Sequence, residues 1–292
     1  MTVLLGKLTC VLQKDPFNNL KVSNGSIVRF SVDDKGIFYG YVFSIGTDAD
    51  ENYKITAYDQ MRYLKNTDIY TFSNMAASDI FAKLCRDYNL KYTVKTPTKF
   101  VPAPYCFDGK TLYNIMERGM NLASINDNTL YFIIDDFGTL TWSTFTAEGT
   151  QTSIQLGDAS LVTSYTYEKS IDNDTFNRIK LYRQNQDKGK IDTWYASDSD
   201  NIKRWGILQY AASVDDNMNA AQVREMVERL LKTKNRQTET LKLQGEGVLD
   251  CVAGKRIKFV LEREGLNKWM WIKSSTHTFT KYEHTMDLEV EV

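Results

Sequence analysis

Apolar and polar residues alternate along the first sixty positions of the chain. The runs at 26–32, 37–45 and 53–59 have this period of two, and the polar stretches DDKG and GTDADEN separate them. A period of two places successive side chains on opposite faces of a strand, and polar stretches of this composition are typical of turns. The pattern therefore predicts an antiparallel meander of three strands.

The apolar spacing changes to that of helices after position 73. DGKTLYNIMERGM has apolar residues three and four positions apart, and so does an earlier stripe made of Ala77, Ile80, Phe81, Leu84, Cys85 and Tyr88. This spacing predicts two short amphipathic helices. Gly119 lies on the second apolar stripe, where it would let a neighbouring element approach closely. Between the helices, KTPTKFVPAPYCF contains three of the four prolines, which predicts an irregular or extended connector.

Strand patterns dominate the remainder of the chain, with one exception. LYFIIDDFGTLTW at 130–142 is typical of a hairpin around DDFG, and alternation continues in SLVTSYTYEK, NRIKLYRQ and the closing HTMDLEVEV. The exception is a predicted long amphipathic helix near 216–234. Glu225 precedes Arg229, and Glu228 precedes Lys232, by one helical turn in the favourable order. Its apolar stripe consists of Val223, Met226, Val227, Leu230 and Leu231.

Two of the alternating regions resemble each other. NGSIVRFSVDDKG at 24–36 aligns without a gap with AGKRIKFVLEREG at 253–265, so that Gly25 matches Gly254 and Gly36 matches Gly265. In the same register FYGYVFSI aligns with NKWMWIKS, and an alternating strand, YKITAYD or HTMDLEV, follows each copy. A common hairpin composition accounts for part of this similarity. We interpret the rest as an internal duplication that flanks a helical insert.

Each copy is too short to close a barrel, so it must recruit other strands, for which GKLTCVL and ETLKLQG are the candidates. The sequence thus predicts a mainly β, α+β protein with two antiparallel β-barrel domains, a small α/β insert and one long amphipathic helix. The expected boundaries are 1–65 for the first barrel unit, 66–152 for the insert and 153–292 for the second barrel unit. Because the chain begins directly at a strand, we expect other segments to complete the first barrel.

Length, charge and cysteine content limit the domain organisation, the binding partners and the cellular location that the sequence allows. The 292 residues exceed the size, roughly 250 residues, above which single cores tend to split. With 36 basic and 37 acidic residues, the net charge of -1 provides no sequence-wide attraction to nucleic acid or anionic membranes. No signal peptide or membrane span is present, which predicts a protein soluble where it is made. Four widely spaced cysteines, without CxxC pairs or nearby histidines, argue against zinc and fit a reducing cytoplasm: Cys10, Cys85, Cys106 and Cys251.

The chain resembles a known family in several segments. KITAYDQMRYLKN, FSNMAASDIFAKLCRDYNL, GKTLYNIMERGM and WMWIKSSTHTFTKYEHTMDLEVEV look like the XkdQ/YqbQ-like proteins of defective prophages and phage-tail-like bacteriocins. These belong to the baseplate hub and late control D superfamily of contractile tails. The resemblance covers roughly 7–292, and AYDQMRYL with the following helix is its most distinctive part. Family members are usually longer at the N-terminus, which puts the completeness of the first barrel in question.

The resemblance implies a non-enzymatic structural hub subunit of the virion baseplate, assembled in the bacterial cytoplasm, without catalytic residues, cofactor or metal. Three copies, each with two tail-tube-like barrels, would form a ring between the hexameric tail tube and the trimeric central spike. The implied partners are itself, the tube, the spike and other baseplate proteins, with DNA or tape-measure protein passing through the lumen and no membrane insertion. Two similar barrels in three chains present six similar surfaces, which adapts threefold to sixfold symmetry. The particle could be a phage or a DNA-free bacteriocin.

The polar stretch that follows the first β-unit contains Tyr58, Asp59, Arg62 and Tyr63. Such groups occur in active sites, but they also occur at interfaces between domains or subunits. Because the stretch lies between the first β-unit and the helical insert, we interpret it as a junction. We hypothesise that Arg62 pairs with an acidic neighbour and orients this junction.

A tail-associated peptidoglycan hydrolase is the alternative function, because some relatives are described as cell wall hydrolases. Glycosidic cleavage needs two carboxyl groups at about 5 to 10 Å. Candidate acids are Asp135 with Asp136 in a turn, Asp215 with Asp216 at a helix start, and Glu246 between glycines, and each has an ordinary structural explanation. His277 and His284 lie in neither a GxSxG nor an HExxH motif, which favours packing or interface roles.

A carbohydrate-binding β-module is a third hypothesis. Four tryptophans could point to it if they were exposed, although core packing explains most such residues: Trp194, Trp205, Trp269 and Trp271. The basic run LLKTKNRQ at 230–237 could contact nucleic acid in the lumen of a hub. Cations at the C-terminal end of a helix explain it equally well, because they interact favourably with the helix dipole.

Overall fold

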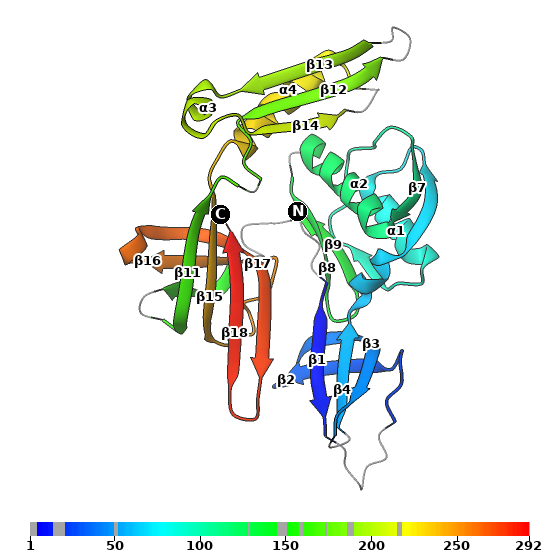
Figure 1. Cartoon of the computed structure of the whole chain (residues 1–292). Coiled ribbons are helices and arrows are strands. Elements are labelled where there is room, and N and C mark those ends of the chain that lie inside the picture. Colours follow the sequence, from blue (N-terminus) through cyan, green and yellow to red (C-terminus); the bar gives the residue numbers. More distant parts are fainter. Residues whose placement is uncertain are drawn as a thin grey trace. The chain divides into compact units, whose positions relative to one another are not determined.

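A computed structural model describes residues 5–13, 21–49, 52–127, 129–144, 151–157, 160–172, 174–185, 190–214 and 218–291 (Figure 1). In this part of the chain the protein is mainly β, with helices and several separate sheets. The chain divides into two compact units, Met1–Gly149 and Thr150–Val292. The predicted division at 65/66 stays a prediction.

A four-stranded antiparallel sheet forms the first part of the first unit. Its order is β1-β4-β3-β2, so the predicted meander is present and the N-terminal strand joins it beside β4, as expected for GKLTCVL. On one face of this sheet Val42, Ile55 and Ala57 are buried. The strands are β1 (Lys7–Leu12), β2 (Ile27–Val32), β3 (Lys35–Thr47) and β4 (Tyr53–Tyr58).

An α/β module completes the first unit. Its two helices confirm the helical spacing of the sequence, and a Cβ placed on Gly119 would lie 3.3 Å from the Cβ of Ala77, which is the predicted close approach. The module also contains a two-stranded sheet, β5-β7, and a three-stranded sheet of order β6-β9-β8. The elements are η1 (Gln60–Lys65), β5 (Thr67–Phe72), α1 (Ala77–Asp87), β6 (Tyr92–Val94), β7 (Tyr105–Thr111), α2 (Leu112–Asp127), β8 (Tyr131–Asp135) and β9 (Leu140–Thr144).

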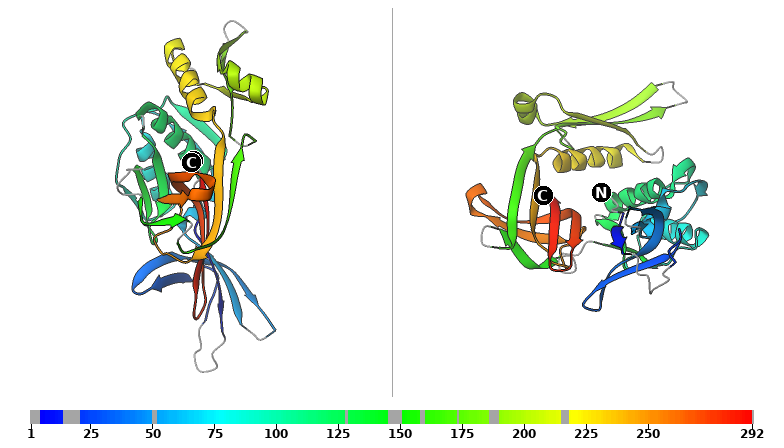
Figure 2. Two further views of the ribbon diagram at one scale, coloured as in Figure 1. Left: turned by 90° about the vertical axis from the view of Figure 1, so that its left-hand side faces the viewer. Right: turned by 60° about the horizontal axis from the view of Figure 1, so that its bottom comes forward.

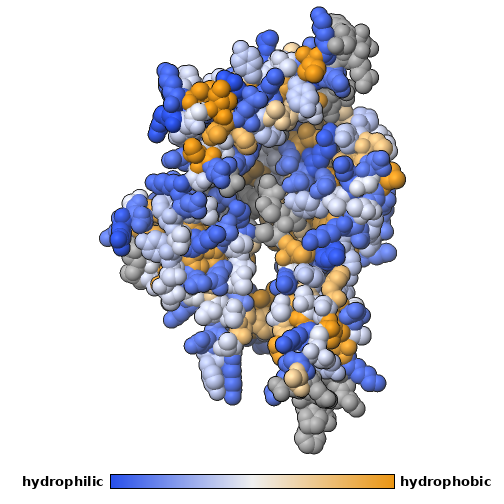
Figure 3. Space-filling view, in the orientation of Figure 1, coloured by the Kyte–Doolittle hydropathy of each residue, from blue (hydrophilic) through white to orange (hydrophobic). Residues whose placement is uncertain are grey.

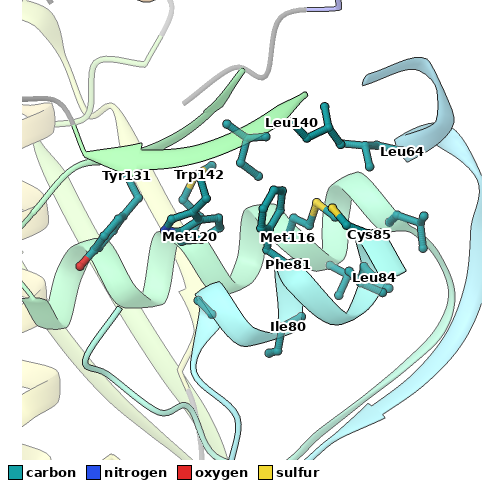
Figure 4. Packing of buried hydrophobic residues seen from close by; sticks show 14 of the residues in the cluster. Leu64, Ile80, Phe81, Leu84, Cys85, Met116, Met120, Tyr131, Leu140 and Trp142 are labelled. Carbon is teal, nitrogen blue, oxygen red and sulfur yellow. The ribbon is translucent and has the colours of Figure 1, made fainter. Parts of the chain in front are cut away.

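The core of this module lies between the helices and the β6-β9-β8 sheet. Figure 4 shows Phe81 of α1 and Met116 and Met120 of α2 beside Leu140 and Trp142 of β9. The proline-containing connector is irregular over 95–104 and is anchored to α1, because the backbone N–H groups of Ser78 and Thr98 donate to each other's hydroxyl oxygens at 3.1 Å. The module therefore has a hydrophobic core, and its irregular segment is held at the start of α1.

A six-stranded half-barrel forms most of the second unit. Its order is β10-β16-β17-β18-β15-β11, with β10 parallel to β16 and the other neighbours antiparallel (Figures 1 and 2). ETLKLQG joins beside β18, as predicted. The strands are β10 (Gln151–Gly157), β11 (Val162–Ser170), β15 (Thr238–Glu246), β16 (Arg256–Leu261), β17 (Leu266–Phe279) and β18 (His284–Glu291), and η3 (Glu262–Glu264) connects β16 to β17.

The sequence predicted closed barrels, whereas the described strands form open sheets. Within the residues described above, both sheets have two outer strands, β1 and β2 in one and β10 and β11 in the other. The strand periodicity correctly predicted which segments pair. It carries no information on whether the first and last strands meet, because closure depends on the curvature and stagger of the whole sheet.

A second α/β module lies between β11 and β15 in the sequence. The sheet β13-β12-β14 packs against α4, which confirms the predicted long helix, although the helix begins at Ala220. The sequence did not predict α3, which Asp198 caps by accepting from the N–H groups of Asp200 and Asn201. The elements are β12 (Arg178–Asn185), β13 (Lys190–Ser197), α3 (Ser199–Trp205), β14 (Gln209–Ser213) and α4 (Ala220–Lys234).

The start of α4 corrects one expectation. Asp215 and Asp216, the expected capping residues, lie outside the described residues. Asn219 caps the helix in a reciprocal capping box with Gln222. Of the predicted ion pairs, Arg229 contacts Glu225 at 2.6 Å. Among the helices described, none is long and apolar enough to cross a membrane.

Candidate functional site

The four-stranded sheet of the first unit has a structural counterpart in the second unit. The order β1-β4-β3-β2 corresponds to β15-β18-β17-β16, with every pair antiparallel in both. The boundaries of β2 and β16 coincide in the sequence alignment, since Ile27 matches Arg256 and Val32 matches Leu261. The structure thus confirms the internal repeat.

Backbone hydrogen bonds repeat at the start of both copies. Gly25 and Gly254 have φ angles of 85° and 87°, a conformation that favours glycine. The N–H of Gly25 donates to Val42 O at 2.8 Å, and the N–H of Gly254 donates to Ile272 O at 2.8 Å. Val42 N–H donates in return to Ser26 O at 2.9 Å, as Ile272 N–H does to Lys255 O at 2.8 Å. Gly25 and Gly254 therefore begin equivalent hairpins.

The β-bulges also correspond. The pairing of β3 with β4 shifts between Val42 and Ser44, and that of β17 with β18 shifts between Ile272 and Ser274. Directly before the bulge, Val42 lies opposite Ala57 as Ile272 lies opposite Val290. Bulges bend a strand at a defined place, so the two copies share their curvature as well as their strand order.

The ungapped alignment is wrong after the hairpin turn. Val42 corresponds to Ile272, one residue beyond the position that the alignment gives it. The first copy turns at Asp33 and Asp34 and contains an additional bulge in β3, whereas the second copy turns through η3 and Gly265. Gly36 therefore lies in β3 opposite Ser31 and does not correspond to Gly265. The different turns shift the register by one residue, which a comparison of residue types could not detect.

The predicted junction lies where β4 enters η1. Asp59 accepts from the N–H groups of Gly6 at 2.8 Å and Met61 at 3.0 Å. The Gln60 side chain, which is 3% exposed, donates to Gly138 O at 2.5 Å and accepts from Lys91 N–H at 3.0 Å. The Gln60 bonds hold η1, which follows β4 directly, to the rest of the α/β module, and the Asp59 bonds join the start of η1 to Gly6 beside β1. Sequence reasoning missed Gln60, and no sequence signal distinguishes it from a surface glutamine.

Asp135 is the second acid of the junction. It accepts from Gln60 N–H at 2.9 Å and from Gly138 N–H at 2.5 Å, the latter within the DDFG turn. Burial, together with the charge of Asp135, raises the pKa of Asp59 to about 7, and burial also raises the pKa of Asp135. Raised carboxyl pKa values occur in general acids, but here backbone N–H groups occupy both oxygens of both carboxylates. The arrangement is that of a structural pair.

The other predicted junction residues form an aromatic layer on the outer face of the four-stranded sheet. The ring of Tyr63 lies 5.8 Å from those of Tyr41 and Phe43, and Tyr58 lies 5.4 Å from Phe43. The guanidinium carbon of Arg62 lies 5.2 Å from the centroid of Phe43. Among the described residues Arg62 forms this cation–π contact and no ion pair, so the hypothesis of an acidic partner is replaced by an aromatic one.

The equivalent outer face of the second copy is also aromatic and basic. Trp271 and Trp269 are half-buried, with the guanidinium carbon of Arg256 at 5.2 and 5.9 Å from their centroids. Trp194 and Trp205 are half-buried beside Arg183 and Arg204, respectively. Because all four tryptophans carry arginine contacts and none has a fully exposed ring, the structure gives no support to a carbohydrate platform.

The two histidines meet at the end of the β17–β18 hairpin. His277 Nε2 lies 3.0 Å from the carbonyl oxygen of Cys251, which can only accept, so this nitrogen carries the proton. With His277 neutral, its Nδ1 accepts from His284 Nε2 at 3.0 Å. Burial lowers the pKa of both, and the ring of Phe279 stacks on His284 at 4.1 Å. The pair has the features of a packed structural pair, in line with the sequence interpretation.

The remaining candidates have local roles. Asp136 closes the DDFG turn with Thr139, and Glu246 is exposed at the end of β15. In the basic run, Lys234 pairs with Asp174 at the C-terminal end of α4. All four cysteines are free, and burial raises the thiol pKa of Cys251 to about 11. No cluster of three or more metal-ligating side chains exists within the described ranges.

The comparison with known proteins agrees with the architecture. A model of the YqbQ-like family matches residues 2–291. The chain belongs to the YqbQ-like family. Uncharacterized protein YqbQ of Bacillus subtilis (strain 168) is 32% identical over 92% of this chain and 82% of its own length. The phage-like element PBSX protein XkdQ of the same strain is 28% identical over 97% of this chain and 86% of its own length.

The YqbQ-like fold also occurs in a solved structure. The 43 kDa tail protein of prophage MuSo2 from Shewanella oneidensis has a TM-score of 0.68 and 15% sequence identity, and the match covers 98% of this chain and 88% of that chain. The resemblance to prophage tail proteins that the sequence predicted is therefore confirmed. At 15% identity the likeness to this solved structure concerns the fold alone.

Proposed function

We propose that this chain is a structural baseplate hub subunit of a contractile phage or phage-like tail. Three copies would form a ring that joins the hexameric tail tube to the trimeric central spike, in a virion tail assembled in the bacterial cytoplasm. Membership of the YqbQ-like family supports this, because the relatives include a protein of the phage-like element PBSX. DNA or tape-measure protein would pass through the lumen, and other baseplate proteins would surround the ring.

One observation carries the proposal: the two four-stranded sheets match in strand order, direction and bulge position. A chain that binds a single partner has no need for two such sheets. Three chains would supply six similar sheets, which matches a sixfold ring on one side while the chains keep threefold symmetry on the other. Each open sheet would become a tail-tube-like barrel when strands are added in the assembly, which removes the exposed edges.

The first experiment measures assembly. Purified chain is mixed with tail tube protein from the same particle, and the molar mass is determined by light scattering during size-exclusion chromatography. We expect complexes that contain three hub chains. A hub:tube stoichiometry incompatible with three chains would contradict the proposal. Trimerisation is expected only in the presence of tube or spike if the ring needs a partner, so the mixture is the decisive sample.

A matched pair of variants tests the role of the duplication. Arg29 in β2 and Lys258 in β16 occupy equivalent positions. If both copies contact the tube, Arg29→Glu and Lys258→Glu weaken tube binding to similar degrees, whereas Lys232→Glu on the exposed side of α4 has no effect. An effect from one copy only would show that six equivalent surfaces are not used.

The peptidoglycan hydrolase alternative has one observation in its favour, the raised pKa of Asp59 beside Asp135. Its test is clearing of a suspension of purified cell walls, followed by turbidity. The hub proposal expects no clearing by the wild-type chain. Clearing that disappears in Asp59→Asn but remains in Asp136→Asn would replace the hub by the hydrolase.

A further inference from the structure

The two copies of the repeat differ at one edge. In the second copy β16 lies between β17 and β10, whereas the described residues place β2 at the end of its sheet, with β3 as its neighbour. β10 runs parallel to β16, and its Gln155, Leu156 and Gly157 lie opposite Lys258, Phe259 and Val260. The second copy therefore shows what kind of segment fits this edge.

The backbone of β2 presents the same hydrogen-bonding groups as that of β16. Val42 N–H donates to Ser26 O, so the alternation of antiparallel pairing turns the amide groups of Val28 toward β3. The amide groups of Ile27, Arg29 and Ser31 consequently point to the outer edge. In β16 the corresponding residues Arg256, Lys258 and Val260 lie opposite Gln151, Gln155 and Gly157 of β10. An open edge with this row of groups is a template for another strand.

Within the described ranges, no strand lies beside β2 in the way that β10 lies beside β16. Ile257 and Leu261 of β16 are 0% and 1% exposed, and Leu156 of β10 belongs to the same buried cluster. The aligned Val28 and Val32 of β2 are only half-buried, and Ile27 on the other face is 54% exposed. Figure 3 shows hydrophobic surface over the four-stranded sheet of the first unit. Added apolar cover would stabilise this sheet by reducing its contact with water.

We propose that the outer edge of β2 is a strand-acceptor site for an extended segment of a partner polypeptide. The segment runs parallel to β2, with an aliphatic residue opposite Phe30 and a glycine opposite Ser31. It comes from a partner and not from a second copy of this chain, because β10, which supplies this pattern in the second copy of the repeat, is already paired with β16 in its own unit. This inference concerns the edge alone and holds independently of the hub proposal.

The requirement for glycine follows from β10. Gly157 has a φ of 159°, and a Cβ added to it would lie 1.8 Å from the carbonyl oxygen of Val260. A side chain at this position would collide with the backbone of the acceptor strand, which cannot move aside without breaking its own ladder. β2 and β16 coincide in their boundaries and in their pairing with the next strand as far as Phe30 and Phe259, so we expect the segment bound beside Ser31 to meet the same restriction.

The test uses a fluorescently labelled peptide with the sequence of residues 151–157, QTSIQLG, and the full chain. We expect saturable binding by fluorescence anisotropy. A peptide that ends in alanine in place of glycine should bind at least about tenfold more weakly, because of the backbone collision. Arg29→Pro should abolish binding, since proline removes an outward N–H and is tolerated on edge strands. The matched control Arg29→Ala keeps that N–H and should bind within about twofold of the wild type.

Hydrogen exchange gives a readout that does not depend on the folding of any variant. On addition of the peptide to the wild-type chain, the amides of Ile27, Arg29 and Ser31 should exchange more slowly, while that of Val28, already bonded to β3, should not change. Absence of saturable binding, or equal binding to a folded Arg29→Pro chain, would overturn the proposal. A third outcome would also overturn it: the chain is a dimer in which the edge amides are already protected, and the peptide dissociates this dimer. The occupant of the edge would then be a second copy of the chain.

Discussion

The two copies of the repeated sheet have the same backbone design and different cores. The inner face of the second copy contributes to a cluster in which Phe259, Ile272 and Val290 are fully buried, covered by β10, β11 and the loop that contains Cys251. On the first copy, Val42, Ile55 and Ala57 are buried, while the outer strands keep half-buried side chains. Duplication therefore preserved the hydrogen-bonded frame, and each copy obtained its cover from different surroundings.

The outer faces differ as well. In the first copy, Tyr63 and Arg62 of η1 and Phe137 of the DDFG turn lie on the aromatic face of β3. In the second copy, Trp269 and Trp271 of β17 contact Arg256 of the neighbouring strand. An aromatic and cationic face is thus common to both copies, but only the first uses it to attach an α/β module. The same frame serves as a junction in one unit and as a surface in the other.

The largest expected effect comes from one phenylalanine in each copy. Phe259→Ala should lower the free energy of unfolding of the second unit by about 3 to 5 kcal/mol, because it empties a fully buried site. Phe30→Ala, at the equivalent but half-buried position, should cost roughly half as much. Hydrogen exchange measured unit by unit compares the two. Equal losses would show that both copies have equally complete cores.

The two units should respond to pH in opposite directions. Asp59, with a pKa raised to about 7, keeps its proton in the folded chain at pH values where the unfolded chain has lost it. Its contribution to stability is therefore complete below the unfolded pKa of 3.8 and is lost as the pH rises through 7. His277 and His284 have lowered pKa values, so stability falls as the pH drops below 6.5, where the unfolded chain binds protons more readily.

The expected change for the first unit between pH 5 and pH 8 is on the order of 2 to 4 kcal/mol. The measurement is hydrogen exchange of both units at pH 5, 6.5 and 8, corrected for intrinsic rates. Asp59→Asn, which stays neutral, should flatten the profile of the first unit and leave that of the second unchanged. Parallel profiles for the two units in the wild-type chain would refute the opposing assignments.

Gln60 tests whether the junction is specific to the first copy. Gln60→Ala removes the partners of Gly138 O and Lys91 N–H inside the first unit and should cost about 2 kcal/mol, because buried polar groups then stay unpaired. Gln244→Ala removes an exposed glutamine bond to Asp287 in the second sheet and should be nearly neutral. Urea unfolding followed unit by unit measures both. A neutral Gln60→Ala would mean that the amide does not hold the junction together.

Arg62→Ala should have the smallest effect. Its contact with Phe43 is a partly exposed cation–π pair, for which a loss of about 0.5 to 1 kcal/mol is expected. Arg62→Lys should recover part of this loss, because a cation over the ring is retained. Thermal unfolding of the first unit is the measurement, and a loss above that of Gln60→Ala would restore the idea that Arg62 orients the junction.

Local patterns determined much of this fold in advance. The period of two located β2, β3 and β4, and the helical stripe located α1, α2 and α4 within a few residues. Gly119 predicted a close approach, which the structure shows between α2 and α1. The alignment of Gly25 with Gly254 predicted two equivalent hairpins. Family membership followed from segments that the structure assigns to η1, α1 and α2. These features are local, because each depends on residues a few positions apart and on the conformations that their side chains allow.

Tertiary structure alone decided the rest. The one-residue shift after the hairpin, the parallel position of β10 and the burial of Gln60 and Asp135 depend on pairings between distant segments. Their residue types are also common on surfaces and in turns, so no local pattern marks them. Whether a duplicated sheet has a complete core depends on what covers it, and that is determined by contacts over the whole unit. For this reason the sequence could predict two similar sheets but not that, among the described residues, β16 pairs with a strand on each side and β2 with a strand on one side only.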